Sequence, residues 1–96
     1  MQFVSISERR KGFAEADYAA VSVQEVQRAR ELYSAGFIRQ IWHRSDKPGA
    51  CILWEADGEE HVRQMLDTLP FMQARLIEVV VIPLKPYGGF APARSS

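Results

Sequence analysis

The chain has 96 residues, of which 47% are apolar, and this length allows one domain with a modest core and excludes a second. Twelve basic and twelve acidic residues balance, so there is no overall positive field to attract nucleic acid, and no apolar run is long enough to span a bilayer. We therefore expect neither nucleic acid nor a membrane among the partners of this chain.

The single cysteine, Cys51, cannot form a disulfide within the chain. This fits a reducing compartment, and the N-terminus lacks the long apolar stretch of a secretory signal. We therefore expect a cytoplasmic protein, in which Cys51 is a small core residue.

Residues 2–8 alternate between two faces, which is typical of a half-buried strand. A turn at 9–12 follows, and its few basic residues are interpreted as a solvated turn rather than a binding tail. Residues 14–35 carry apolar side chains at three- and four-residue spacing, which predicts a helix. Gly36 is expected to end this helix because glycine readily adopts the left-handed conformation.

The middle of the chain predicts a β-hairpin. Strands at 37–44 and 50–56 are joined by residues 45–49, whose sequence Ser-Asp-Lys-Pro-Gly is a strong turn signal. A second helix then begins at Asp57 or Gly58.

Pro70 is expected to end the second helix, and the β-branched residues of 76–84 predict a fourth strand. The order β-α-β-β-α-β is that of the ferredoxin-like α+β fold, an antiparallel four-stranded sheet with two helices on one face. We expect residues 1–86 to form this domain and residues 87–96 to form a C-terminal tail.

The tail carries Tyr87 and Phe90 on either side of two glycines. Two interpretations stay open for it. The tail either crosses a neighbouring subunit and covers its cavity, or it is a frayed terminus. For residues 91–96 we expect no fixed structure.

Strand alternation sorts the side chains of the expected sheet into two sets. The set expected to face the helices is Val4, Ile6, Ile41, Cys51, Leu53, Val79 and Val81. The opposite set is Ser5, Ser7, Gln40, Trp42, Ile52, Trp54, Glu78, Val80 and Ile82. In the simplest hairpin register Trp42 lies opposite Ile52 and Gln40 opposite Trp54, a register that a bulge would change.

The opposite set mixes apolar and polar side chains, which is unusual for a sheet face in water. An exposed apolar patch of this kind indicates an interface or a ligand groove. We therefore expect a second copy of the chain to cover this face, with the polar residues lining a small-molecule cavity between the two sheets.

Glu78 is the sharpest candidate for chemistry. A carboxylate among apolar neighbours such as Val80 and Ile82 loses hydration, and a desolvated carboxylate exchanges protons closer to neutral pH. The plainer alternative is a Glu78 that is exposed at a strand edge or paired with Arg75 or Arg39.

The remaining candidates are ligand-binding residues on the same face. Trp42 and Trp54 offer a flat wall to a planar ligand, or they pack at an interface. Gln40 can orient a carbonyl oxygen, and Ser5 and Ser7 can donate hydrogen bonds to a carboxylate. The alternative for these three is that they bind water.

Arg39 either reaches a substrate carboxylate at the cavity rim or pairs with Glu55 across the hairpin. His43 and His61 are interpreted as surface or capping residues. No spacing of histidine, cysteine and carboxylate residues indicates a metal site, so no metal is expected.

Several short motifs, in their order and spacing, resemble muconolactone isomerase. These motifs are Ile41-Trp42, Glu55, Glu60-His61, Leu69-Pro70-Phe71, Glu78-Val79, Pro83-Leu84 and Pro86. The resemblance covers most of the chain and is densest over residues 38–86. It implies a ferredoxin-like domain whose sheet pairs with that of a second copy into a dimeric α/β barrel, with larger rings of dimers in some members.

The resemblance also implies a reaction. The family moves a double bond in a small unsaturated lactone by taking a proton from one carbon and returning it to another, without metal or cofactor. The family match, together with the place of Glu78 on an otherwise apolar sheet face, makes Glu78 our hypothesis for the base. The family's basic residues on the first strand, and its histidine on the second, correspond here to Ser5, Ser7 and Gln40.

Two other functions stay open. The same fold supports cofactor-independent oxygenation or cyclisation of aromatic, polyketide-like compounds. The other alternative is a non-catalytic dimer that binds a small molecule.

Overall fold

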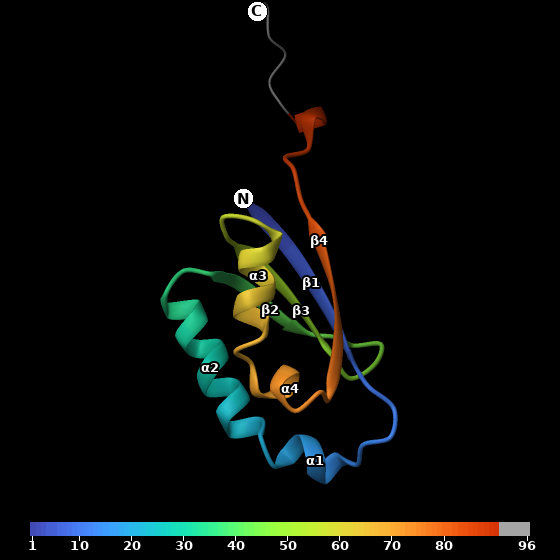
Figure 1. Ribbon diagram of the computed structural model, residues 1–96. Helices are drawn as coiled ribbons and strands as arrows, with labels where there is room; N and C mark the ends of the chain where they lie inside the picture. The colour runs from blue at the N-terminus through green and yellow to red at the C-terminus, as the bar shows by residue number, and fades with distance from the viewer. Residues whose placement is uncertain (91–96) are drawn as a thin grey trace, which may run out of the picture.

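The computed structural model describes residues 1–90 as one antiparallel sheet with helices packed on one of its faces (Figure 1). The strand order is β2-β3-β1-β4, which is the order of the ferredoxin-like fold. The strands are β1 (Gln2–Arg9), β2 (Ile38–His43), β3 (Ala50–Glu55) and β4 (Ile77–Pro83). The predicted fold class is therefore confirmed, and each predicted strand lies within one residue of its observed bounds.

Each predicted helix is divided in two. The helices are α1 (Glu15–Ala19), α2 (Ser22–Ser34), α3 (Glu59–Leu66) and α4 (Pro70–Gln73), with a short 3₁₀ turn η1 (Gly88–Phe90) in the tail. The predicted helix over 14–35 breaks at Val21, whose φ of −122° and ψ of 7° leave the helical region. Tyr18 explains the break, because its buried hydroxyl donates a hydrogen bond to the Leu76 carbonyl at 2.9 Å and so ties α1 to the start of β4.

Two of the three predicted helix boundaries are observed, at Gly36 and at Gly58, and the third, at Pro70, is not. Gly36 has a φ of +88° just beyond α2, as expected for a glycine that ends a helix, and Gly58 is the N-cap of α3. Pro70 was wrongly expected to end the second helix. It begins α4 instead, because the first helical position needs no backbone N–H donor and suits the fixed φ of proline.

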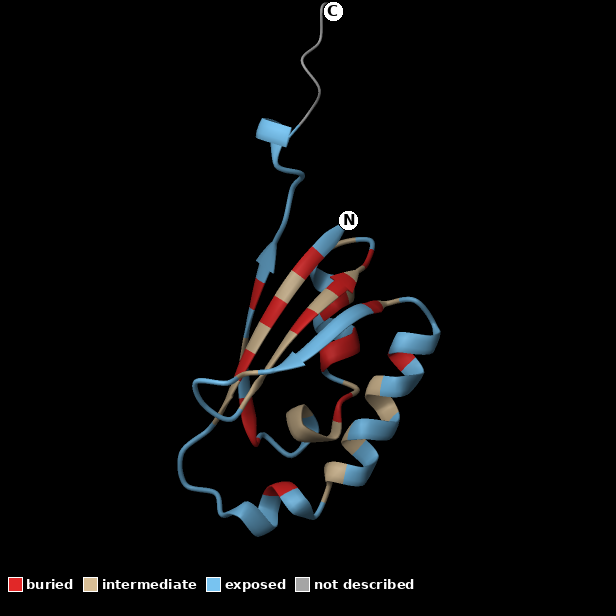
Figure 2. Cartoon of the chain, turned by 180° about the vertical axis from the view of Figure 1, so that it is seen from behind, coloured by how far each residue is buried: buried red, intermediate tan, exposed pale blue. Residues whose placement is uncertain are grey.

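The sheet faces differ from the prediction for two of the four strands. In β1 the residues that face the helices are Phe3, Ser5 and Ser7, and in β3 they are Ile52 and Trp54. Figure 2 shows this alternation as buried and intermediate bands along β1. The assignment of Val4, Ile6, Cys51 and Leu53 to the helix-facing side was therefore wrong.

Size and hydrogen bonding explain the correction. Phe3 and Trp54 are the two largest fully buried side chains, and the Trp54 indole N–H donates a hydrogen bond to Ser5 Oγ at 2.8 Å. A small hydroxyl beside a large aromatic ring thus fills the core and satisfies the indole donor. For β2 and β4 the predicted faces hold, since Val81 is buried and Trp42, Val80 and Ile82 lie on the other side.

The hairpin register also differs from the prediction. An irregularity between Ile38 and Gln40 shifts the pairing by one residue, so Trp42 lies opposite Cys51 and Gln40 opposite Leu53. Glu55 forms an ion pair with the Met1 ammonium at 2.6 Å rather than the predicted pair with Arg39.

The second face of the sheet is mainly apolar and, within residues 1–90, carries no helix (Figure 2). We call it the open face. Its apolar side chains are Val4, Ile6, Trp42, Cys51, Leu53, Val80 and Ile82. Cys51 therefore lies on the open face and is only partly buried, not in the core as expected.

Beyond β4 the chain runs away from the domain (Figure 1). Tyr87 and Phe90 are 70% and 86% exposed, and their rings stack edge to face at 4.7 Å. The expectation for residues 91–96 lies outside the described residues. Over residues 1–90, no helix combines the length and apolar character needed to cross a membrane.

The buried contact between Trp54 and Ser5 predicts the cost of removing one partner. Ser5→Ala should lower the free energy of unfolding by about 1–3 kcal/mol, because the indole N–H is left buried without its acceptor. Urea denaturation measures this change, with Ser45→Ala in the exposed hairpin turn as the control. A loss no larger than that of the control would contradict the role given to this hydrogen bond.

Candidate active site

An apolar cavity of about 550 Å³ lies between the helix-facing side of the sheet and the helices α2 and α4. Its apolar walls come from both layers and include Val26, Ala29, Ile41, Ile52, Leu69, Phe71, Ile77 and Val79. This volume and this lining are those of a small-molecule site. The cavity lies within one copy of the chain, whereas the sequence predicted a cavity between two sheets.

Glu25, in the first turn of α2, is the carboxylate of the cavity. Its Oε1 accepts a hydrogen bond from the Phe71 N–H at 2.9 Å. Burial raises the pKa of the Glu25 carboxyl, and the hydrogen bond from Phe71 opposes this rise to a smaller extent. Glu25 is therefore a partly desolvated acid with one oxygen fixed by the backbone.

The fold explains why that N–H is free to bind Glu25. Phe71 follows Pro70 in the first turn of α4, where backbone N–H groups have no partner within the helix. Glu25 shares one helix stripe with Ala29 and Leu32, and this stripe faces the sheet. The packing of α2 on the sheet thus carries the carboxylate into the cavity.

Other polar groups line the same cavity: Ser5, Ser7, Arg9, Ser22, Arg30, Tyr33 and His43. The two strand serines already have partners in the fold. Ser5 Oγ accepts from Trp54, and Ser7 Oγ accepts a hydrogen bond from the Ala50 N–H at 3.0 Å. Ser7 and Ser5 therefore lie at the cavity, although on the other side of the sheet from the one predicted.

Glu78 lies outside this cavity. It is exposed on the open face of β4, with Glu8 as its cross-strand neighbour. The apolar surroundings expected for it are absent within residues 1–90, because Leu76 and Ile77 turn toward the core and Val80 is 61% exposed. Its catalytic role stays a prediction that requires a second copy to cover the open face.

The other predicted residues divide between the two sides. Trp42, on the edge strand β2, belongs to the open face and also contributes to the lining of the cavity, whereas Trp54 is fully buried in the core. Gln40 and Arg39 are exposed on β2 and do not line the cavity. The structure therefore brings Ser5, Ser7 and Trp42 together, and the substrate-binding role of the predicted set stays a prediction.

Sequence reasoning missed Glu25 because it lies among the charged residues of a helix. A signal was present in the spacing, since Glu25 precedes Ala29 by four residues and Leu32 by seven, and such residues share a helix face. Among residues 1–90, no group of three or more histidine, cysteine or acidic residues is placed to hold a metal ion.

Fold and cavity together define a class of protein: a small ferredoxin-like domain with a mainly apolar cavity between its sheet and its helices. The family model described as muconolactone delta-isomerase matches residues 3–89. The chain therefore belongs to the muconolactone delta-isomerase family, as the sequence motifs had indicated.

Two solved structures have the same fold. A crystal structure of muconolactone isomerase superposes with a TM-score of 0.77 at 16% identity, covering 98% of this chain and 98% of that one. The 5-chloro-2-hydroxyhydroquinone dehydrochlorinase of Burkholderia phenoliruptrix, in complex with 2,5-dihydroxybenzoquinone, superposes with a TM-score of 0.74 at 18% identity, covering 88% of this chain and 94% of that one. No curated protein matches the chain in sequence.

The raised pKa of Glu25 predicts a dependence of stability on pH. The folded chain keeps the Glu25 proton to a higher pH than the unfolded chain, so folding takes up a proton between the two pKa values. The free energy of unfolding should therefore fall as pH rises through this window. Glu25→Gln removes this effect, because glutamine does not titrate and can still accept the Phe71 N–H.

Urea denaturation between about pH 4 and about pH 8 tests this prediction. The stability of Glu25→Gln relative to the unsubstituted protein should increase with pH over that range. Glu60→Gln, at an exposed position on α3, is the control and should not show this trend. A constant difference between Glu25→Gln and the unsubstituted protein would contradict the desolvation of Glu25.

Proposed function

We propose that this protein is a cofactor-free isomerase that moves a double bond by proton transfer in a small unsaturated lactone or related acid from aromatic breakdown, with Glu25 as the acid–base residue. One observation carries the proposal: the partly desolvated carboxylate of Glu25 in an apolar cavity of about 550 Å³. Membership of the muconolactone delta-isomerase family supports it.

The reaction needs one group that both removes and returns a proton. The Glu25 carboxylate takes a proton from a carbon beside the carbonyl, and the electron pair of the broken C–H bond spreads through the conjugated system. The resulting carboxylic acid then gives the proton to a different carbon, which moves the double bond and restores the carboxylate. A raised pKa brings the two protonation states of the carboxyl closer in free energy near neutral pH, which suits both half-steps.

The fixed geometry of Glu25 supports this role. The Phe71 N–H holds one carboxylate oxygen, and within residues 1–90 the other oxygen has no hydrogen-bond partner. The lining of the cavity is mostly apolar, which reduces the hydration of a bound substrate and of the Glu25 carboxylate. Glu78 has neither of these features within a single copy of the chain, so the cavity favours Glu25 over the residue that the sequence singled out.

Turnover of muconolactone, followed by ultraviolet absorbance, tests the proposal directly. The purified protein should isomerise the lactone, and Glu25→Gln should lower kcat by about 100-fold or more, because the variant keeps the shape of the cavity and loses the base. Glu78→Gln is the matched control and should retain most of the activity.

The other outcomes have definite meanings. Activity that survives Glu25→Gln and is lost in Glu78→Gln would overturn the role of Glu25 and return catalysis to the open face. Binding of a flat aromatic compound without isomerisation would favour an oxygenase, a cyclase or a binding protein. The fold shared with a dehydrochlorinase that holds a benzoquinone makes a hydroxylated quinone the compound to test there.

We also propose that the open face pairs with that of a second copy, as in a dimeric α/β barrel. The support is the exposed apolar surface, in which Val80 is 61% exposed at the centre of β4. A face of this kind in water is unfavourable, and self-association buries it.

Light scattering tests this self-association. Val80→Glu should convert the assembly to monomers, because it places a charge in the proposed interface. Val23→Glu, on α2 and 75% exposed, is the matched control and should leave the assembly unchanged. A monomeric unsubstituted protein, or an assembly unaffected by Val80→Glu, would contradict the proposal.

A further inference from the structure

Arg9 stands between the cavity and a second hollow on the surface. It is the last residue of β1, opposite Ile77 of β4, and its side chain lines the cavity. The same side chain also lines a hollow of about 540 Å³ at the end of the sheet. The other residues of this hollow are Glu8, Arg10, Lys11, Phe13, Arg75 and Glu78.

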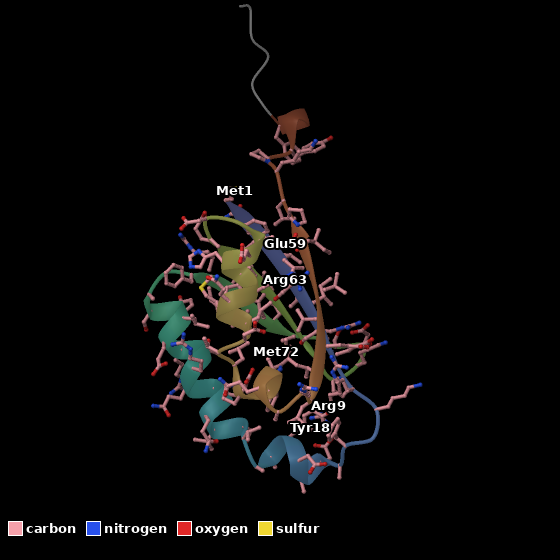
Figure 3. The ribbon with its side chains drawn as sticks, viewed as in Figure 1. Met1, Arg9, Tyr18, Glu59, Arg63 and Met72 are labelled. Carbon is pink, nitrogen blue, oxygen red and sulfur yellow. The ribbon has the colours of Figure 1, made fainter. Side chains whose placement is uncertain are left out.

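Two residues of α1 hold the Arg9 side chain in place. Its guanidinium forms an ion pair with Glu15, and its central carbon lies 4.0 Å from the centre of the Tyr18 ring. Figure 3 shows Arg9 beside Tyr18, where α1 meets the start of β4. Tyr18 is itself buried and anchored to the Leu76 carbonyl, so the guanidinium rests on a rigid surface.

This arrangement leaves the guanidinium with unused binding capacity. Among the described residues, Glu15 is the one hydrogen-bond partner of the Arg9 side chain, which carries several further N–H donors. Glu15 is 83% exposed, so its ion pair with Arg9 is in water and is weak. An anion bound from the cavity side meets a lower dielectric and competes well with it.

The charges around Arg9 favour an anion. Arg10, Lys11 and Arg75 surround the surface hollow, against the carboxylates of Glu8 and Glu78. Lys47 binds Glu8 at 3.2 Å and so offsets one of these two negative charges. The surface hollow beside Arg9 therefore carries a net positive charge.

We propose that Arg9 is the specificity-determining residue of the cavity and that it binds the carboxylate of an anionic ligand. This inference rests on the proposed function, because it assumes that the cavity takes a small molecule. Glu25 on α2 then acts on the reacting carbons, while Arg9 at the end of β1 holds the charged substituent. Arg9 thereby compensates for the uncharged Ser5 and Ser7 on the same strand, whose hydroxyls have partners within the fold.

Calorimetry with two unreactive ligands tests the proposal. The first is the saturated analogue of muconolactone, a butyrolactone with an acetate side chain, and the second is its primary amide, which has the same shape without the charge. The unsubstituted protein should bind the acid about tenfold more tightly than the amide. In Arg9→Gln this preference should disappear, with the affinity for the amide unchanged.

Two further variants make the result decisive. Arg63→Gln removes an arginine of α3 that is paired with Glu59 away from the cavity, and it should keep the preference for the acid. Glu15→Gln removes the competing carboxylate and should tighten binding of the acid alone. Circular dichroism checks that each variant is folded.

Three results would overturn the inference. The first is equal affinity for acid and amide in the unsubstituted protein, and the second is a preference for the acid that survives Arg9→Gln. Either result would mean that the cavity binds a ligand but that Arg9 does not bind its carboxylate. Binding of neither compound by the folded protein would overturn both this inference and the proposed function. Weaker binding of the acid in Glu15→Gln would contradict the competition between Glu15 and the ligand.

Discussion

The indole N–H of Trp54 is the group on which the arrangement of this domain depends. The side chain is fully buried, so its donor must be satisfied inside the fold, and Ser5 Oγ accepts it at 2.8 Å. This contact determines which side chains of β1 and β3 point toward the helices, because side chains alternate strictly along paired strands. A slip of one residue would bring Val4 and Leu53 to the core and expose Trp54 and Phe3, the two largest fully buried side chains.

The different character of the two sheet faces follows from this orientation of the side chains. On the helix side, small serines lie where larger residues would fill the space between sheet and α2, and a cavity with polar groups at its walls is present. On the open face, the aliphatic side chains of the same strands form an apolar surface. One face therefore carries the candidate chemistry, and the other carries the proposed self-association.

The sequence was sufficient for the fold and for the family, because both depend on features that are local in the chain. The strand patterns, Gly36 and the hairpin turn predict the element order, and the short motifs indicate the family. The facing of β1 and β3 could not be predicted in this way. Both faces of these strands carry apolar residues, so alternation alone does not distinguish them, and the choice depends on the tertiary contact between Trp54 and Ser5.

The candidate site was only partly predictable for the same reason. Ser5, Ser7 and Trp42 were predicted as binding residues of a cavity between two sheets, and they contribute to the lining of a different cavity within one copy of the chain. Glu25 was not singled out, and Arg9 was interpreted as part of a solvated turn. Their importance comes from contacts across long sequence separations, with Phe71 for Glu25 and with Tyr18 for Arg9. Glu78 was predicted from its apolar strand to be removed from water. It is exposed, because nothing within residues 1–90 of one copy of the chain covers that side of β4.

The proposed reaction requires that the cavity hold a carboxylate partly removed from water. The most direct test is a titration of the Glu25 side-chain carboxyl, observed by carbon-13 NMR with Glu25→Gln used to assign the signal. We expect a midpoint above the ordinary glutamate value of about 4.3, since burial raises the pKa of Glu25 more than the hydrogen bond from Phe71 lowers it. A midpoint at or below that value would mean that Glu25 is fully hydrated, and the cavity would then lack the acid–base group on which the proposed reaction depends.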